Sequence, residues 1–115
     1  MRRSKAKGYP GSWFADVDDE RLPCVHDCYR TKDGRDYFDR YSGLGLKKWE
    51  NFVEAIRSGR CVIVTVDKIL SEGPNFQKSF KRKGYVGVFE VADVEADSEG
   101  LRFRFVQQLA DLTDQ

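Results

Sequence analysis

Three residues with reactive side chains alternate along one short segment of the chain: Cys24, His26 and Cys28. If this segment is an extended strand, the side-chain period of two places all three on one face, roughly 7 Å apart at successive positions. Tetrahedral zinc sites usually draw paired ligands from a turn, and only Cys61 remains as a distant further thiol. A catalytic cysteine also needs a base within hydrogen-bond reach, which this spacing does not guarantee. We therefore expect no metal site and no cofactor, although the sequence leaves open whether the three residues form a site.

Acidic residues are plentiful, and Asp33, Asp36 and Asp39 lie three positions apart. A nuclease core would need an acid on one strand and an acid, any residue and a lysine on the next, a spacing that Asp67 and Lys68 lack. The chain also contains no phosphate-binding glycine loop, serine-nucleophile motif or dinucleotide fingerprint. The sequence therefore predicts no catalytic residues, and we interpret the acidic residues as solvating their segment.

Basic and aromatic residues interleave in two segments, residues 76–85 and residues 37–41. This composition suits nucleic acid, because an unpaired base stacks on an aromatic face while cations contact the phosphates. It also suits a solvated loop that phenylalanine anchors in the core. If the two segments bind nucleic acid, tryptophan or tyrosine would stack on a base and the cations of residues 76–85 would hold phosphates. The expected nucleic-acid-binding residues are Trp13, Tyr37, Tyr41, Lys78, Lys81, Arg82 and Lys83.

The elements that would position these residues begin with a basic terminus. Residues 1–11 mix Lys, Arg, Ser, Gly and Pro with little to bury, which predicts a flexible basic arm. Residues 12–17 and 22–30 have the pattern of two strands of a hairpin, and Pro23 favours an edge position for the second strand. An exposed sheet edge could also join two copies in a homodimer. Residues 31–45 show no sustained period, which predicts a long functional or partner-facing loop.

The most regular pattern predicts a helix over residues 47–58, which Gly59 is placed to end. Residues 61–66 are apolar at every position but one, as is typical of a central strand covered on both sides. Residues 71–84 contain glycine, proline and the basic cluster, and we expect them to form a loop. The apolar face of the helix consists of Trp49, Phe52, Val53 and Ile56.

The last part of the chain has the pattern of an antiparallel hairpin. Residues 85–94 predict a strand in which Gly87 marks a bulge or a close approach to the backbone, and residues 97–100 predict a turn. The returning strand alternates its apolar and basic residues. Its expected inward residues are Leu101, Phe103 and Phe105. Residues 109–115 are expected to form a polar tail.

Length and composition fit one small domain. The chain has 115 residues, 34% of them charged, and its net charge of +1 predicts no particular partner. Curved antiparallel strands with one main amphipathic helix predict an α+β domain over residues 12–108, with a strongly curved sheet or pseudo-barrel. Three cysteines fit a reducing compartment, and no apolar run approaches the length of a membrane span. We therefore expect a cytoplasmic protein without membrane contact.

The order of these motifs resembles the central part of PUA-like domains, and most of all the EVE and ASCH groups, over residues 47–91. Arg60 differs from the acidic residue that these groups usually have after the glycine. The resemblance implies a compact pseudo-barrel and an association with RNA or with modified bases in DNA, often held in a pocket rimmed by aromatic and polar side chains. The motifs that carry it are the helix end Ser58-Gly59-Arg60, the apolar strand 61–66 and the sequence Gly84-Tyr85-Val86-Gly87-Val88-Phe89-Glu90-Val91.

The function that the sequence favours is a non-enzymatic nucleic-acid-binding module of PUA-like type, for RNA or for DNA with modified bases. The alternative is a protein-interaction or regulatory domain that binds no nucleic acid and uses the strand near Pro23 or the segment 31–45 as its contact. A small thiol-dependent or metal-dependent enzyme is the third hypothesis.

Overall fold

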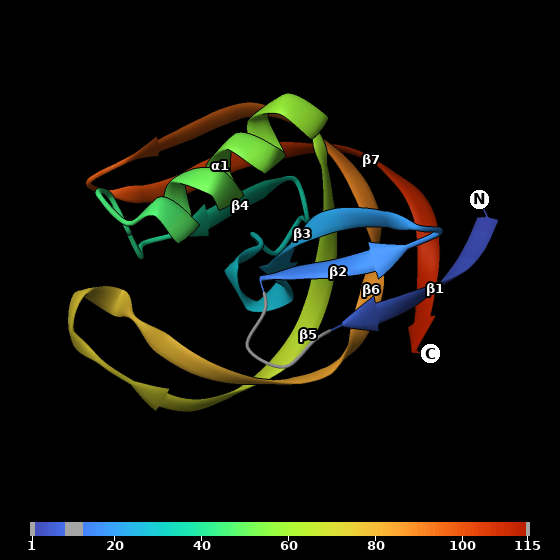
Figure 1. The fold of residues 1–115 in the computed structure, drawn as a ribbon, viewed down its shortest axis with the longest axis horizontal. Coiled ribbons are helices and arrows are strands. Elements are labelled where there is room, and N and C mark those ends of the chain that lie inside the picture. Colours follow the sequence, from blue (N-terminus) through green and yellow to red (C-terminus); the bar gives the residue numbers. More distant parts are fainter. Residues whose placement is uncertain (1, 9–12, 115) are drawn as a thin grey trace.

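The chain forms a seven-stranded sheet and one α-helix in the computed structural model, which describes residues 2–8 and 13–114 (Figure 1). The elements follow one another in the order β1 (Arg2–Gly8), β2 (Phe14–Val17), β3 (Glu20–His26), the 3-10 turn η1 (Asp27–Tyr29), β4 (Asp36–Asp39), α1 (Lys47–Gly59), β5 (Cys61–Glu72), the 3-10 turn η2 (Pro74–Phe76), β6 (Lys78–Asp97) and β7 (Gly100–Asp114). The expected α+β class, with one main amphipathic helix, is confirmed.

The sheet curves until its two ends meet. Its strand order is β1-β2-β3-β5-β6-β7-β4, and β1 also pairs with β7, so that the strands from β1 to β7 close into a ring with β4 attached outside it. The closing pair is parallel and runs from Arg2 opposite Ala110 to Ala6 opposite Asp114. The pair β3–β5 is also parallel, whereas the remaining strand pairs are antiparallel. This closed arrangement agrees with the expected strongly curved sheet or pseudo-barrel.

The two ends of the chain belong to the sheet, which differs from the expected arm at residues 1–11 and tail at residues 109–115. Most of the first segment is β1, and the second continues β7 as far as Asp114. Ala6, Ala110 and Leu112 are buried where the two strands pair. From Ser4 to Lys7 the strand alternates buried Ser4 and Ala6 with exposed Lys5 and Lys7, as the side-chain period of two predicts. Residues 9–12 and Gln115 lie outside the described residues.

The strand β3 lies inside the sheet, so the expected edge position of Pro23 is wrong. It pairs with β2 on one side and with β5 on the other. Proline is tolerated because the pairing with β5 begins only at Cys24. The strand also ends earlier than expected, at His26, and η1 follows it. Cys28 therefore lies in a 3-10 turn and does not share a strand face with Cys24 and His26.

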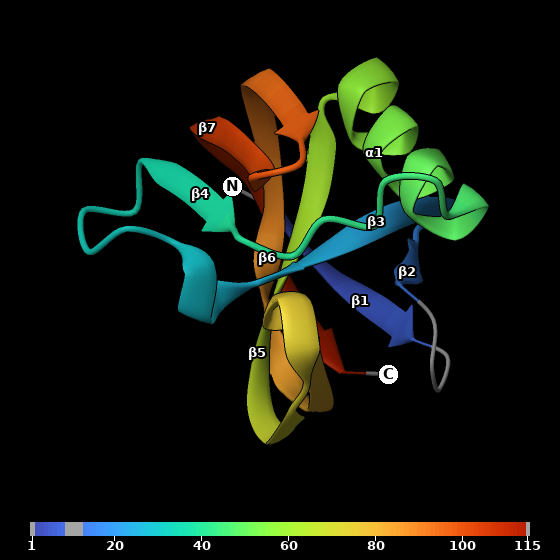
Figure 2. The same ribbon diagram turned by 90° about the vertical axis from the view of Figure 1, so that its left-hand side faces the viewer.

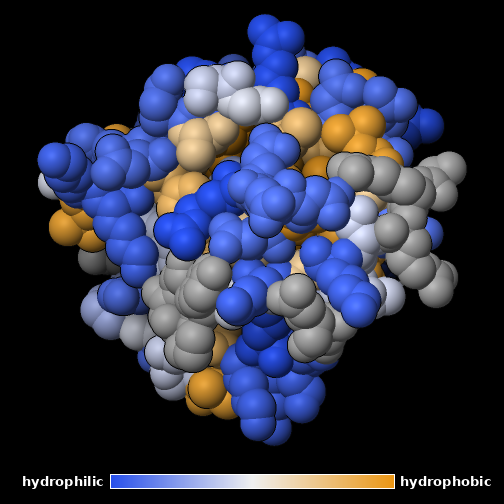
Figure 3. Space-filling view, turned by 45° about the vertical axis from the view of Figure 1, so that its right-hand side comes forward, coloured by the Kyte–Doolittle hydropathy of each residue, from blue (hydrophilic) through white to orange (hydrophobic). Residues whose placement is uncertain are grey.

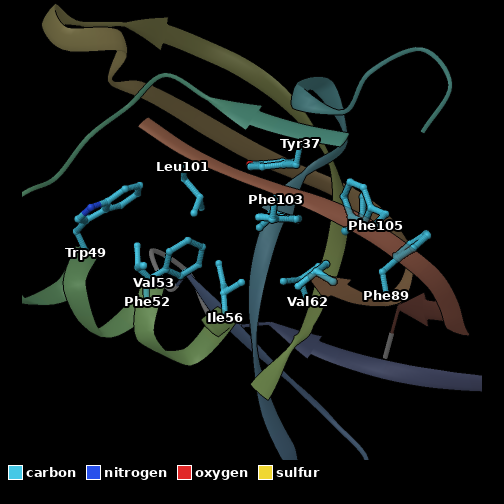
Figure 4. Close-up of a cluster of buried hydrophobic side chains, with 13 residues drawn as sticks. Tyr37, Trp49, Phe52, Val53, Ile56, Val62, Phe89, Leu101, Phe103 and Phe105 are labelled. Carbon is cyan, nitrogen blue, oxygen red and sulfur yellow. The ribbon is translucent and has the colours of Figure 1, made fainter. Parts of the chain in front are cut away.

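The helix α1 covers the core with the four apolar residues that the sequence pattern indicates, including Trp49. Figure 4 shows Trp49, Phe52 and Ile56 pointing from α1 towards the side chains of the sheet. The residue that ends the helix in the left-handed region is Arg60, with φ 54°, and not Gly59 as expected. The backbone N–H of Arg60 still donates to the carbonyl oxygen of Ile56 at 2.9 Å.

The expected loop over residues 71–84 is instead the end of a long hairpin between β5 and β6. We call residues 66–84 the hairpin arm; it extends out from the rest of the sheet, away from α1 (Figures 1 and 2). Its two strands stay paired almost to the tip, where Glu72 lies opposite Lys78. The tip itself is η2. The arm carries the basic cluster of the predicted binding residues, Lys78, Lys81, Arg82 and Lys83.

Two glycines allow close backbone packing in the hairpin between β6 and β7. Gly100 has φ 126°, which favours glycine, and a Cβ there would overlap the carbonyl oxygen of Asp39. A Cβ at Gly87 would overlap the carbonyl oxygen of Ala110, so the close approach predicted at Gly87 is confirmed. The β6 backbone also shifts register here, since Val64 pairs with Gly87 while the next residue of β5 pairs with Tyr85.

Hydrophilic residues cover most of the face in Figure 3, and hydrophobic residues show between them. Within the described part of the chain, α1 is too short and too polar to cross a membrane, and the structure contains no other helix that could.

Candidate nucleic-acid interface

A cavity of about 760 Å³ lies between the hairpin arm, the end of β3, and the first turns of α1. Half of the residues that line it are aromatic. Its aromatic side chains come from opposite sides: Trp13 and Trp49 from the body of the domain, and Phe80 from the arm. Charged groups also line it, among them Asp39 and Lys48. The cavity therefore combines aromatic faces with cations and carboxylates.

Trp13 and Tyr41, two of the predicted binding residues, both line the cavity. Both are partly buried, with ring centroids 6.5 Å apart in an edge-to-face arrangement. Trp13 also packs edge-to-face against Phe52 at 5.4 Å, and the Nζ of Lys48 lies 4.4 Å from the centre of the Trp13 ring. The backbone N–H of Tyr41 donates to Asp39 at 2.9 Å. Trp13 therefore lines the cavity between aromatic neighbours and next to a cation.

Tyr37 is a core residue and does not offer a ring face to a ligand. Its side chain is 2% exposed, and its ring stacks on Phe103 with centroids 4.6 Å apart and planes 10° apart. Figure 4 shows the two rings lying parallel. The Tyr37 hydroxyl accepts a hydrogen bond from the backbone N–H of His26 at 3.3 Å, and burial raises the pKa of Tyr37 well above its usual value. Within the expected loop, Tyr37 lies on the strand β4, which pairs with β7.

The expected cations divide between two faces of the arm. Lys78 and Arg82 line the cavity, whereas Lys81 and Lys83 are exposed and do not. The alternation of side chains along β6 is the reason for this division. The Nζ of Lys78 lies 5.1 Å from the centre of the Tyr29 ring and 3.7 Å from a carboxylate oxygen of Glu72.

A histidine and an aspartate that were not expected to meet form the most polar part of the cavity. The Nδ1 of His26 and the Oδ2 of Asp67 are 2.8 Å apart, and the hydroxyl of Thr65 donates to the same carboxylate oxygen. The His26 ring also stacks on Phe80, with centroids 3.9 Å apart and planes 16° apart. The two partners lie 41 residues apart in the chain, and parallel pairing of His26 with Thr65 brings them together. No local motif signals such a pair.

Asp67 is the electrostatic centre of this group. Its side chain is only 2% exposed. Burial by itself would raise the pKa of Asp67, but hydrogen bonds from His26 and Thr65 and the charge of Arg82 lower it below its usual value. The Nε of Arg82 lies 3.8 Å from Asp67, is buried, and has no hydrogen-bond partner among the described residues. Asp67 is therefore ionised at neutral pH, and it keeps a proton on the Nδ1 of His26.

The other carboxylate of the cavity, Asp39, behaves differently. Burial raises its pKa, and this effect exceeds the lowering by the hydrogen bond from the Tyr41 backbone and by the nearby His26 and Lys78. An ionised Asp39 would repel a phosphate. The cation-rich side of the cavity, with Lys78 and Arg82, therefore suits an anionic group better than the side formed by Asp39.

The cysteines are free thiols in separate environments. Burial raises the pKa of Cys24 to about 11. Cys28 is exposed, and its pKa is also raised, chiefly by partial burial. Both thiols are therefore mostly protonated at neutral pH, which disfavours thiolate chemistry. Within the described residues, no three His, Cys, Asp or Glu side chains gather in a geometry that could hold a metal ion.

Comparisons with protein-family models, with characterised proteins and with solved structures found no match to this chain. The geometry of the cavity and the sequence pattern therefore carry the functional argument.

Proposed function

We propose that this protein is a nucleic-acid-binding module of PUA-like type that holds one unpaired base, of RNA or of modified DNA, in the aromatic cavity. The observation that carries the proposal is a cavity of about 760 Å³ in which half of the lining residues are aromatic and cations lie beside them. Cavities of roughly 300 to 1,000 Å³ suit small ligands, so this cavity has room for a base with its sugar. Every base has a π-face, so aromatic side chains bind bases of any sequence.

His26 is the residue best placed to read the edge of the base. Its ring lines the cavity, and Phe80 and Asp67 fix the orientation of that ring. Because Asp67 engages Nδ1, the ring nitrogen left for a ligand is Nε2, which accepts a hydrogen bond when the imidazole is neutral. A neutral His26 therefore favours a base edge that presents an N–H group.

The cations supply the attraction to phosphates. Lys78 and Arg82 face the cavity and would contact the phosphates next to the bound base. Lys81 and Lys83 would contact phosphates farther along the strand, because they lie outside the cavity. Each contact to a phosphate releases counterions, so binding should weaken as salt increases.

Fluorescence anisotropy with short single-stranded RNA, single-stranded DNA and duplex DNA, with and without modified bases, tests the proposal at two salt concentrations. We expect selective binding of one class, and the substitutions Lys78→Ala and Arg82→Ala should each weaken it and reduce the salt slope by about 1. Trp13→Leu, which removes the indole face, should weaken binding by about 5-fold or more without changing that slope. Arg57→Ala is a matched control, because Arg57 is an exposed cation of α1 that does not line the cavity.

Uniformly weak binding that disappears at physiological salt would contradict the proposal. So would a salt slope that the two cavity substitutions leave unchanged. Either result would favour the alternative, a protein-interaction domain, which capture of a stoichiometric protein partner after nuclease treatment would support. The cytoplasmic location and the homodimer remain predictions.

A further inference from the structure

The tip of the hairpin arm presents an exposed phenylalanine. Phe76 is 54% exposed. A tight turn holds it, in which the backbone N–H of Gly73 donates to the carbonyl oxygen of Gln77 at 2.7 Å, and that of Gln77 donates to Pro74 at 3.2 Å. The core does not need the ring of Phe76, because the clusters of buried hydrophobic residues do not include it.

The backbone of Phe76 lies in the left-handed region, with φ 61°. Bulky residues rarely adopt this conformation, which glycine or asparagine would adopt with less strain. Among the residues that the structure describes, the other non-glycine residues at positive φ are three aspartates and the residue that ends α1. Aspartate tolerates this region and helix ends commonly use it, so Phe76 is the exception. Both its strain and its exposure oppose folding, which indicates that the ring serves a purpose outside the fold.

The position of Phe76 indicates what that purpose is. The ring borders the aromatic cavity, so it lies at the entrance through which a base would pass. The guanidinium of Arg40 lies 5.6 Å from the Phe76 ring and 5.9 Å from the ring of Phe38. An exposed apolar ring next to a cation, at the border of the cavity, fits a base-paired nucleic acid, whose stacked bases the ring can enter while the cation contacts a phosphate.

The outer face of the same arm carries charge that needs an anionic partner. Lys68 and Lys81 lie directly opposite each other on β5 and β6, and such a pair of like charges is unfavourable. Lys83 is the extra residue where the pairing shifts between Val66 and Asp67. Among the described residues, none forms an ion pair with these three exposed lysines. A duplex that meets the tip of the arm would bring its phosphates to them.

We propose that Phe76 is a wedge that inserts between the stacked bases of a duplex and displaces the base that the cavity then holds, while Lys68, Lys81 and Lys83 contact the phosphates. This inference rests on the proposed function, because the displaced base needs the cavity as its binding site. The wedge stabilises the opened duplex by filling the space that the base leaves. A single strand needs no such opening and should bind without the wedge.

The test compares wild-type protein with Phe76→Gly on a short duplex that carries one 2-aminopurine in a central mismatch, and on the same strand alone, as DNA and as RNA. Phe76→Gly should weaken duplex binding by about 5-fold to about 100-fold, the range expected for one aromatic stacking contact with a base. It should abolish the rise in 2-aminopurine fluorescence that marks an unstacked base. Binding of the single strand should weaken much less than binding of the duplex, because the other aromatic side chains that line the cavity remain. Glycine relaxes the turn, so the variant should unfold at or above the wild-type Tm.

Phe38→Ala is the matched control. Phe38 is 41% exposed and contacts the same guanidinium of Arg40, but it lies on β4 and not at the tip of the arm. It should leave duplex binding and the fluorescence signal unchanged. The wedge is overturned if Phe76→Gly weakens both ligands equally, weakens neither, or has the same effect as Phe38→Ala. In each of these cases wild-type protein still binds the single strand, whereas failure of the proposed function would appear as wild-type protein that binds neither ligand.

Discussion

Substitution of Gly87 tests whether the strand β6 must pass as close to β7 as the structure shows. A methyl group at this position would overlap the carbonyl oxygen of Ala110 and the side-chain amide of Gln108. The amide can rotate away, but the carbonyl is backbone in the segment of β7 that also pairs with β1. Relief of the overlap therefore requires a shift of the strand that closes the ring. We expect Gly87→Ala to lower the free energy of unfolding.

The magnitude follows from two opposing effects. Overpacking of a tight interior costs about 1 to 3 kcal/mol. Replacement of glycine by alanine at a position free of strain stabilises by about 0.4 to 1 kcal/mol, because the unfolded chain loses conformational freedom. Gly84→Ala shows the loss of unfolded-chain freedom without overpacking. Gly84 lies on the same strand, has no positive φ and has no atom within 4 Å of the added Cβ. Gly84→Ala should therefore be neutral or slightly stabilising.

Urea denaturation followed by circular dichroism measures both variants. We expect Gly87→Ala to be less stable than Gly84→Ala by about 1 to 3 kcal/mol, because the two variants share the second effect, and its Tm to be lower by several degrees. Equal stability of the two variants would refute the close approach between β6 and β7, and with it the closed arrangement of the sheet in this region. A loss of stability in both variants would indicate that glycine is needed along this strand for its conformational freedom and not for space.

Two further predictions concern the thiols and the polar part of the cavity. Native-state alkylation near neutral pH should label Cys28 well before Cys24, because Cys28 is exposed while burial protects Cys24 and raises its pKa to about 11. Equal labelling rates, measured by mass spectrometry, would contradict this placement of the two thiols. Asp67→Asn should cost about 1 to 3 kcal/mol at pH 7, because the charged hydrogen bonds with His26 and Thr65 are weakened. Folding lowers the pKa of Asp67, so its contribution to the free energy of unfolding is present above the unfolded pKa near 4 and disappears as pH falls through the lower folded pKa. Urea titrations should therefore show the stability of the wild type approaching that of the variant only in acid.

Strong local periodicity accounts for the parts of the fold that could be predicted. The apolar face of α1 and the alternation of Leu101, Phe103 and Phe105 each appear within a few residues, and both patterns match the buried positions. The turn at Gly100 follows from its sequence in the same way. The tail of β7 could not be predicted, because Ala110 and Leu112 are buried by pairing with a strand at the opposite end of the chain. Local patterns do not report pairing over such distances.

The hairpin arm was misread for a different reason. Its residues contain glycine, proline and many lysines, which usually indicate a loop, and that signal hid an alternation in which Lys78, Phe80 and Arg82 line the cavity. Exposed residues lie between them, including Lys81. A period of two in a basic segment is as much a strand pattern as a period of two in an apolar one.

The same alternation limits how the arm can act. A loop could gather all its cations around one phosphate, but a paired strand holds Lys78 and Arg82 on the face opposite Lys81. The predicted binding residues therefore cannot form one site. If the cations on both faces of the arm bind nucleic acid, the arm has ligand on both faces, with a base on the inner face and phosphates on the outer face. A duplex from which one base has left its stack provides both a free base and a row of phosphates. This arrangement does not depend on Phe76. It makes the outer lysines necessary for duplex binding and dispensable for binding of a single base.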